Sequence, residues 1–208
     1  MRGSEAAPGM RRTALFGGTF DPIHLAHLEI ARAAADRFDL AKVLFVPAAN
    51  PPHKPDGATA PYEDRVRMTE LACAPANDGG DARFEVSRIE AGWPRSYSIL
   101  TIEKLRTAVS GRLNFLIGAD AFAEIRTWHR WREIVASVDF IVVTRPGAQW
   151  EIPPGARVFE LTGIDLSVSS SEIRTRIASG DLEVPLPKAV LGYILEHGIY
   201  QSQMKKII

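Results

Sequence analysis

Residues 14–28 have the sequence ALFGGTFDPIHLAHL, which joins an apolar, β-favouring segment to a helix through a tight loop. The apolar segment ends at Gly17-Gly18, and Pro22 precedes a run of helix formers that begins near Leu25. Glycines at such a turn let backbone N–H groups approach a ligand, and the start of a helix adds unpaired N–H groups and the positive end of its dipole. The turn therefore suits a bound phosphate.

Two histidines, His24 and His27, lie three residues apart at the start of this helix, so both would face the phosphate. Simpler explanations are a plain turn, a buried core histidine, or a zinc pair. Zinc needs three or four ligands, and no other His or Cys lies at metal-motif spacing from this pair, so we expect no metal ligands in the protein. The common phosphate loops G-x-x-x-x-G-K-[ST] and G-x-G-x-x-G are both missing from the sequence.

The rest of the chain alternates short apolar segments with amphipathic ones. We expect strands at 13–16, 42–46, 83–89, 113–117, 140–144 and 157–161. We expect helices at 25–37, 62–74, 121–125 and 131–137, with three more between Ser98 and Gly111, Ser169 and Gly180, and Pro187 and Gly198. This alternation predicts a doubly wound, Rossmann-like α/β fold, a parallel sheet flanked by helices in a single domain.

In such folds the ligand binds beyond the carboxyl ends of the strands, where the strand order reverses, commonly between the first and fourth strands. The loop Gly118-Ala119-Asp120 follows the fourth expected strand and would lie opposite the glycine turn. There the Asp120 carboxylate could accept hydrogen bonds from a ribose. An equally simple explanation is that Asp120 caps the helix expected at 121–125.

The composition excludes several classes of protein. The 25 Lys and Arg residues balance the 25 Asp and Glu residues, so the chain lacks the charge of a nucleic-acid or anionic-membrane binder. Cys73 is the only cysteine, which excludes an internal disulfide and fits the cytoplasm, and no apolar run is long enough to span a membrane. We expect a disordered extension at 1–12, the domain at 13–201 and a tail at 202–208. Nothing in the sequence indicates an oligomeric state.

A second informative stretch is VSSSEIR at residues 168–174. Ser169 and Glu172 have the spacing of a capping box, so the stretch predicts a well-capped helix. The serine hydroxyls and free N–H groups of such a helix start also suit phosphate, and Arg174 would add a fixed charge one turn later.

The run GGTFDPIH with His27 resembles the nucleotide-binding signature of the nucleotidylyltransferases that adenylate mononucleotides, and SSSEIR resembles the second signature of that superfamily. Ala26 departs from the first signature, where the family usually has Gly. From Leu15 to Tyr200 the chain is similar to the bacterial nicotinate mononucleotide adenylyltransferases. The other matching segments are 51–54, 96–98, 117–120, 127–128 and 145–147.

This resemblance implies an enzyme of NAD biosynthesis that joins ATP and nicotinate mononucleotide to give nicotinate adenine dinucleotide and pyrophosphate, with Mg²⁺ held mainly by the ATP phosphates. It implies catalytic roles for His24, His27 and Arg174. It implies ATP binding by Gly17, Gly18, Thr19, Phe20, Gly118, Asp120, Ser169, Ser170, Ser171 and Arg174. It implies mononucleotide binding by Lys54, Ser96, Tyr97, Ser98, Trp128 and His129, with Ser98 standing where the family usually has Thr.

Three alternatives remain: pantetheine-phosphate adenylation, nicotinamide-mononucleotide adenylation and a non-catalytic nucleotide sensor. Trp128 and the run 51–54 argue against the first, and the two histidines with Arg174 argue against a sensor. Trp128 could instead belong to the core, but its polar neighbours favour a stacking surface on a loop. The residues around Trp128 carry a modest positive bias that suits an acid. We expect structural roles for Trp131, Cys73 and His197.

Overall fold

The structure, a computed structural model, describes residues 12–52, 57–109, 111–144, 147, 149–164 and 168–201. Its strands are β1 (Arg12–Gly18), β2 (Leu40–Pro47), β3 (Phe84–Val86), β4 (Leu113–Gly118), β5 (Val138–Val143) and β6 (Arg157–Leu161). Its helices are α1 (Leu25–Arg37), α2 (Tyr62–Cys73), α3 (Ser98–Arg106), α4 (Ala119–Ala123), the 3-10 helix η1 (Ile125–Thr127), α5 (Trp131–Ser137), α6 (Ser170–Ala178) and α7 (Lys188–Glu196).

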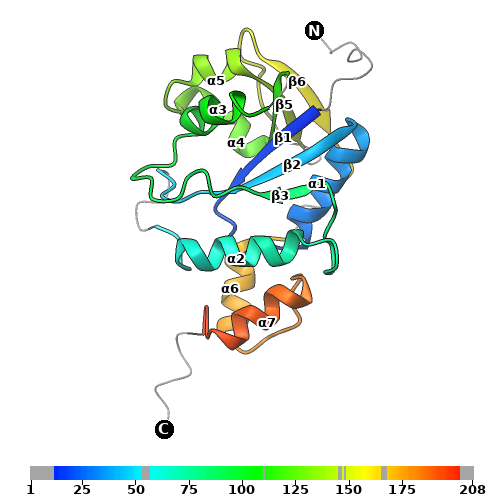
Figure 1. Ribbon diagram of the computed structural model, residues 1–208, viewed down its shortest axis with the longest axis vertical. Helices are drawn as coiled ribbons and strands as arrows, with labels where there is room; N and C mark the ends of the chain where they lie inside the picture. Colours follow the sequence, from blue (N-terminus) through cyan, green and yellow to red (C-terminus); the bar gives the residue numbers. More distant parts are fainter. Residues whose placement is uncertain are drawn as a thin grey trace.

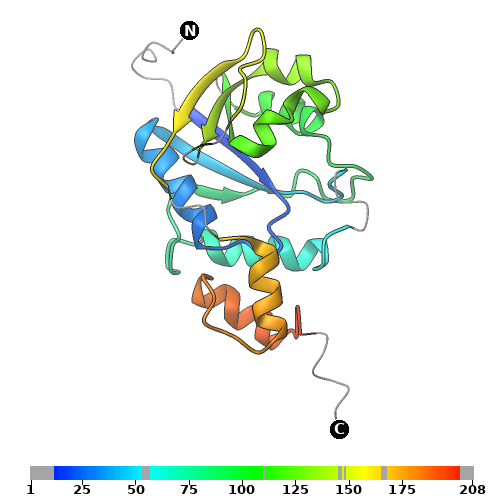
Figure 2. The same cartoon turned by 180° about the vertical axis from the view of Figure 1, so that it is seen from behind.

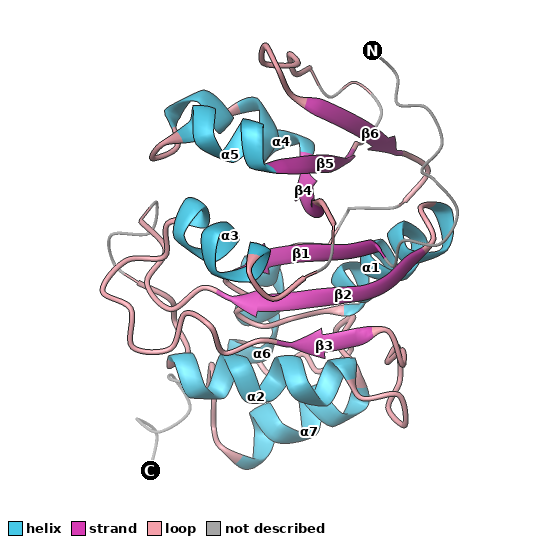
Figure 3. Cartoon of the chain, turned by 45° about the horizontal axis from the view of Figure 1, so that its top comes forward, coloured by secondary structure: helices cyan, strands magenta, loops and turns pink. Residues whose placement is uncertain are grey.

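The strands form one six-stranded parallel sheet in the order β3-β2-β1-β4-β5-β6 (Figure 3). The strand order reverses between β1 and β4, where Leu15 pairs with Phe115. This arrangement confirms the doubly wound α/β fold. It also confirms that the loops after β1 and β4 start side by side at one edge of the sheet, where ligands bind in such folds.

Alternate residues of the strands face two hydrophobic clusters, one on each side of the sheet. Ala14 and Phe16 of β1 face the cluster built from α1, α2, α6 and α7, which includes Leu28, Met68, Ile173 and Val190. Leu15 faces the cluster built from α3, α4 and α5, which includes Ile102, Phe122 and Ile134. Figures 1 and 2 show α6 and α7 beneath α2, at the end of the molecule away from β6. The C-terminal helices therefore lie beside the glycine-rich loop that begins the chain's first crossover.

Most expected elements are present, and their differences have local causes. The glycine pair does not break β1, because Gly17 and Gly18 continue its pairing with β2. β3 is shorter than expected, since it is an edge strand with β2 as its neighbour. Ser98 is the first residue of α3 and does not cap it, because Tyr97 occupies the N-cap position. The expected extension at residues 1–11 and the tail at 202–208 lie outside the described residues.

The guanidinium of Arg65 holds three parts of the chain together from inside the protein. Arg65 is only 1% exposed. Its Nη1 donates to the carbonyl oxygens of Thr19 (2.7 Å) and Ala48 (2.8 Å), its Nη2 donates to Ala49 (3.3 Å), and its Nε donates to Ala60 (3.1 Å). These carbonyls belong to the loops after β1 and β2 and to the segment before α2. One buried cation therefore fixes the chain at the carboxyl edge of the sheet.

Replacing Arg65 with Met should destabilise the protein strongly, because four carbonyl groups, one buried and three partly buried, lose their donor. A buried acceptor left unpaired costs about 1–3 kcal/mol, so we expect the free energy of unfolding to fall by at least about 3 kcal/mol, measured by urea denaturation. Arg67→Met is the matched control, since Arg67 lies on the same helix with a half-exposed side chain and pairs only loosely with Glu70. A change below about 1 kcal/mol for Arg65→Met would contradict this role.

Candidate active site

A cavity of about 300 Å³ opens at the carboxyl ends of β1, β2 and β4. It is lined by many residues that the sequence had suggested, namely Gly17, Gly18, Thr19, Ser96, Tyr97, Ser98, Gly118, Trp128 and His129. Part of the group expected to bind ATP and most of the group expected to bind the mononucleotide therefore share one pocket, whereas the lining does not include Phe20, His24, His27, Asp120, Ser169, Ser170, Ser171 or Arg174. Lys54 lies outside the described residues, as do Arg145 and Pro146.

Glycine is needed at position 18 for packing, whereas at position 17 the structure leaves space for a side chain. A Cβ on Gly18 would lie 2.9 Å from the ring of Phe20, so only glycine lets this ring pack in place. A Cβ on Gly17 would meet nothing within 4 Å and would project into open space. The side chain of Phe20 is 2% exposed and contacts the rings of Phe16 and His27, so it is a core residue whose ring is not available to a ligand.

His24 and His27 form a close pair at the start of α1. Their ring centroids are 3.8 Å apart, and the backbone N–H of His24 donates to Nδ1 of His27 at 3.3 Å. Because Nδ1 of His27 accepts this bond, its ring proton is assigned to Nε2. Nδ1 of His24 is buried and has no hydrogen-bond partner among the described residues. The buried Nδ1 of His24 therefore contributes to the cost of keeping this ring inside the protein.

Burial keeps both imidazoles neutral. Desolvation lowers the pKa of His24 to about 4. Desolvation also lowers the pKa of His27 well below its usual range, and the neighbouring His24 lowers that pKa further. Near neutral pH these side chains are therefore hydrogen-bonding groups, which differs from the cations that a phosphate site leads one to expect.

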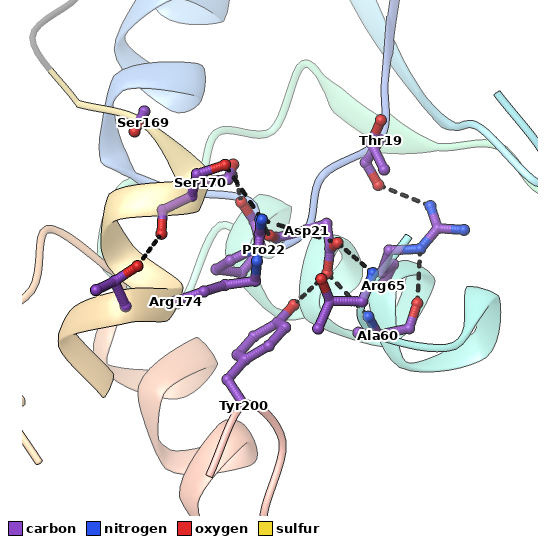
Figure 4. A network of polar contacts seen from close by, with 12 residues as sticks. Thr19, Asp21, Pro22, Ala60, Arg65, Ser169, Ser170, Arg174 and Tyr200 are labelled. Carbon is purple, nitrogen blue, oxygen red and sulfur yellow. Dashed lines mark hydrogen bonds and ion pairs between the residues drawn. The ribbon is translucent and has the colours of Figure 1, made fainter. Parts of the chain in front are cut away.

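The second signature lies directly against the first (Figure 4). Ser169 is the N-cap residue of α6 and accepts a hydrogen bond from the N–H of Glu172 at 3.2 Å, which confirms the expected cap. Ser170 donates its hydroxyl to the carbonyl of Pro22 at 3.0 Å. Arg174 donates from Nη1 to the carbonyl of Asp21 at 2.7 Å. Its Nη2 donates to the hydroxyl of Ser171 at 3.1 Å.

Asp120 lies in the first turn of α4, with its side chain exposed. The expectation that it caps a helix at 121–125 is wrong, because the helix begins at Ala119 and Gly118 occupies the N-cap position. The extended backbone of Gly118 lets the strand pass directly into the helix, which moves Asp120 inside the first turn. Gly118 and Ala121, on either side of it in the chain, both line the pocket.

The loops expected to hold the mononucleotide contact one another through a hydrogen bond and through aromatic rings. Ser96 accepts a hydrogen bond on its hydroxyl from the N–H of Asn50 at 2.9 Å, so it joins two loops of the pocket wall. Tyr97 lies against the ring of His129, with centroids 4.5 Å apart. Trp128 packs edge-on against Phe115 at 6.2 Å and keeps part of its surface exposed in the pocket. This position fits a loop-borne stacking surface better than a core residue.

Much of the positive charge around Trp128 is paired with carboxylates. Arg130 pairs with Glu103 at 2.7 Å and with the neighbouring Glu133 at 2.6 Å, and Arg126 pairs with Glu151 at 3.5 Å. These two arginines are therefore less available to an acidic ligand than the sequence indicated, and the preference for an acid stays a prediction. The N–H of Trp128 is also engaged, since it donates to the carbonyl of Ile125 at 3.1 Å.

The residues expected to be structural agree only in part with that expectation. Cys73 is buried, and burial raises the pKa of its thiol, which fits an inert packing residue. Trp131 is only half-buried, and the guanidinium of Arg132 lies over its ring at 4.5 Å. His197 is exposed at the end of α7 and stacks on Tyr193 at 4.0 Å.

Sequence reasoning missed the residues that hold the signature loop. Asp21 is 2% exposed, and its carboxylate accepts hydrogen bonds from the N–H groups of Thr59 (2.7 Å) and Ala60 (3.1 Å) and from the hydroxyl of Tyr200 (2.7 Å). A charged residue inside the otherwise apolar run at Phe20 and Pro22 was the available signal for Asp21. No local pattern marks Tyr200 or the buried Arg65, because each acts on residues distant in sequence.

The described residues lack two further features. In these parts of the chain, no group of three or more His, Cys, Asp and Glu residues could hold a metal ion. None of the described helices is long and apolar enough to cross a membrane.

The free energy of unfolding should decrease as the pH is lowered, because His24 is buried in its neutral form. The unfolded histidine has a pKa of about 6.5 and the folded one about 4, so between these values the unfolded state binds more protons. The stabilisation is full above about pH 6.5 and is lost as the pH falls towards 4. From pH 7 to 5 we expect His24 to account for a loss of about 2 kcal/mol in the free energy of unfolding.

Denaturant titrations at several pH values measure this loss. His24→Gln should flatten the pH dependence, whereas His197→Gln, which changes an exposed histidine, should leave it unchanged. An equal pH dependence in wild type and His24→Gln would show that burial of His24 does not control it.

The sequence of the chain matches a family model and several known proteins. The cytidylyltransferase-like family model matches residues 15–176. A probable nicotinate-nucleotide adenylyltransferase of Solibacter usitatus is 55% identical and covers 91% of this chain and 99% of its own. One of Thermus thermophilus is 41% identical, covering 91% and 100%.

Among solved structures, Plasmodium falciparum nicotinic acid mononucleotide adenylyltransferase complexed with NaAD superposes with a TM-score of 0.73 at 18% identity, covering 91% of this chain and 97% of its own. The same enzyme complexed with APC gives a TM-score of 0.71 at 17% identity. At these identities the likeness concerns the fold, whereas the sequence matches show the family. The chain belongs to the nicotinate-nucleotide adenylyltransferase family.

Proposed function

We propose that the protein transfers the adenylyl group of ATP to nicotinate mononucleotide, giving nicotinate adenine dinucleotide and pyrophosphate in NAD biosynthesis. The observation that carries the proposal is the meeting of the two signatures. Ser170 and Arg174 of the second donate to main-chain carbonyls of the first, beside a pocket at the reversal point of the sheet. The family membership supplies the reaction, and this contact supplies the place for a triphosphate.

The reaction needs no nucleophile from the protein. A 5′-phosphate oxygen of the mononucleotide attacks the α-phosphorus of ATP, the bond from that phosphorus to the bridging oxygen breaks, and pyrophosphate leaves with the electron pair. Such transfers depend on positioning the two phosphates and on stabilising the developing charge. The protein therefore contributes hydrogen-bond donors and cations.

We assign the ATP phosphates to the loop 17–20 and the start of α6. The open space at Gly17 lets the backbone approach the α-phosphate, and neutral His24 and His27 offer ring N–H groups to it. Ser169, Ser170, Ser171 and Arg174 face the leaving phosphates. Gly118 and Asp120, at the start of α4, are assigned to the adenosine ribose.

We assign the mononucleotide to the other half of the pocket. The partly exposed Trp128 offers a flat surface for the pyridine ring, and Ser96, Tyr97, Ser98 and His129 surround it. Lys54 is assigned to the mononucleotide phosphate. Because the N–H of Trp128 is engaged with Ile125, the carboxylate is left to main-chain N–H groups next to Tyr97 and Trp128.

We assign Mg²⁺ to the ATP phosphates, so that it enters with the substrate and neutralises part of the triphosphate charge. This fits the donor set, because the described residues offer no cluster of acidic and histidine ligands for a resident ion. A buried single cysteine fits a reducing compartment, and we place the enzyme in the cytoplasm.

His27→Ala should lower kcat by a factor of about 100 or more, because removal of one preorganised donor in such a site costs roughly 2.7–4 kcal/mol of barrier. Pyrophosphate release measures kcat, and circular dichroism checks that the fold is kept. His197→Ala, at an exposed position away from the pocket, serves as the control and should leave kcat unchanged. Wild-type turnover by His27→Ala would remove His27 from the mechanism.

The purified protein should prefer nicotinate mononucleotide over nicotinamide mononucleotide. The two rings are nearly isosteric, so the pocket must separate them with hydrogen-bond donors. One or two charge-assisted bonds, each worth roughly 1.5–3 kcal/mol, predict a preference of about ten- to several-thousandfold in kcat/KM.

Chromatography of the dinucleotide products from ATP and each acceptor measures this preference, with pantetheine phosphate as a third acceptor. Equal kcat/KM for acid and amide would refute the acid preference but leave adenylyl transfer standing. No product with any acceptor, despite ATP binding, would indicate a nucleotide sensor.

A further inference from the structure

Tyr200 lies near the end of the described chain, yet it is buried against the first signature (Figure 4). Its side chain is 7% exposed, and its hydroxyl donates to Oδ1 of Asp21 at 2.7 Å. Burial raises the pKa of Tyr200, and the neighbouring Asp21 carboxylate raises it further, so the hydroxyl stays protonated and remains a donor.

Asp21 and Arg174 are neighbours that do not form a close ion pair. Nη1 of Arg174 lies 3.9 Å from Oδ2 of Asp21, while the same nitrogen donates to the main-chain carbonyl of Asp21 at 2.7 Å. The carboxylate is occupied by neutral donors, namely the N–H groups of Thr59 and Ala60 and the hydroxyl of Tyr200. The guanidinium therefore binds the main-chain carbonyl of Asp21 at hydrogen-bond distance and meets the carboxylate only as a loose ion pair at 3.9 Å.

A buried carboxylate that lacks donors gains most from a guanidinium, because paired N–H···O bonds between opposite charges are the strongest available. Without the Tyr200 hydroxyl, Oδ1 would keep only the N–H of Ala60, at 3.1 Å. Asp21 would then draw Arg174 into a closer pair. An arginine neutralised in this way interacts more weakly with an added anion.

We propose that Tyr200 is a positioning residue for Arg174: by donating its hydroxyl to Asp21, it keeps the Asp21 carboxylate from pairing closely with Arg174 and leaves the guanidinium to the phosphates of ATP. This inference rests on the proposed function, in which Arg174 contacts the leaving phosphates. It assigns to the C-terminal end of the chain an effect on ATP that does not extend to the mononucleotide, because Asp21, Arg174 and Tyr200 are not among the residues that line the pocket assigned to it.

Tyr200→Phe tests the proposal by removing one oxygen atom. Calorimetry with Mg·ATP alone should show about tenfold weaker binding, the equivalent of one hydrogen bond to a charged group. In steady-state assays the KM for ATP should rise by a similar factor, while the KM for nicotinate mononucleotide should change less than about twofold. Equal weakening of both substrates would overturn the proposal, since it would indicate general loosening of the site.

Tyr193→Phe is the matched control. Tyr193 also donates its hydroxyl from the C-terminal region to a carboxylate of the body, Oδ1 of Asp64 at 2.8 Å, but it lies away from the first signature. This variant should lower the melting temperature about as much as Tyr200→Phe and leave ATP binding unchanged. Weaker ATP binding in both variants would overturn the proposal, because docking of the C-terminal helices would then explain the effect.

A second test asks whether Tyr200 acts through the charge of Asp21. In an Asp21→Asn background the amide cannot attract Arg174 as an ion, so adding Tyr200→Phe should change ATP affinity less than about twofold. If the two substitutions lower ATP affinity by factors that multiply in the double variant, Tyr200 does not act through the charge of Asp21. If Asp21→Asn does not fold, the comparison of the two tyrosine variants still decides the matter.

The ATP measurement also separates this inference from the proposed function. A wild-type protein that binds Mg·ATP but adenylates no mononucleotide would overturn the proposed function, while Tyr200→Phe would still show whether Tyr200 supports ATP binding. Wild-type ATP affinity in Tyr200→Phe would refute the inference and leave the proposed reaction standing.

Discussion

Burial of the Asp21 carboxylate constrains the signature loop from three sides. A charge out of water must be satisfied by donors, and these come from the segment before α2 and from Tyr200, while Arg174 of α6 binds the Asp21 carbonyl. The buried Arg65 holds the same loop through the carbonyl of Thr19. Helix α6 and Tyr200, which follows α7, therefore help to set the shape of a loop at the other end of the sequence.

The electrostatics of this site follow from the same burial. His24 and His27 lie among aromatic rings and lose their charge, so they keep hydrogen-bonding capacity without repelling each other at a ring separation of 3.8 Å. Arginine cannot be neutralised in this way, because its pKa lies far above neutrality. The site therefore combines two neutral imidazoles at the start of α1 with one fixed charge, that of Arg174 on α6.

The sequence predicted what local pattern determines. Helix α1, the reversal of strand order between the first and fourth strands, and the cap at Ser169 follow from periodicity, the rules of parallel sheets and capping chemistry, and all are present. Interactions between residues far apart in the chain could not be predicted from the sequence. Arg130 was counted as free positive charge because its partner Glu103 is 27 residues away, and Tyr200 had no visible role because Asp21 is 179 residues away. The fold brings such residues together, and their positions in the sequence have no characteristic spacing by which the pair could be recognised.

Ala26 shows how a departure from a family pattern can be compatible with the same site. It is the second residue of α1, so its backbone is in the α region, where alanine is favoured over glycine. In a helix the Cβ atom points towards the N-terminus and to one side, and the first four N–H groups point along the axis, beyond the end of the helix. Ala26 is 6% exposed, which places its methyl group in packing. The methyl group therefore packs at the start of α1, where the N–H of Leu25 donates to the carbonyl of Pro185 and the N–H of His27 donates to the carbonyl of His24, both at 3.0 Å.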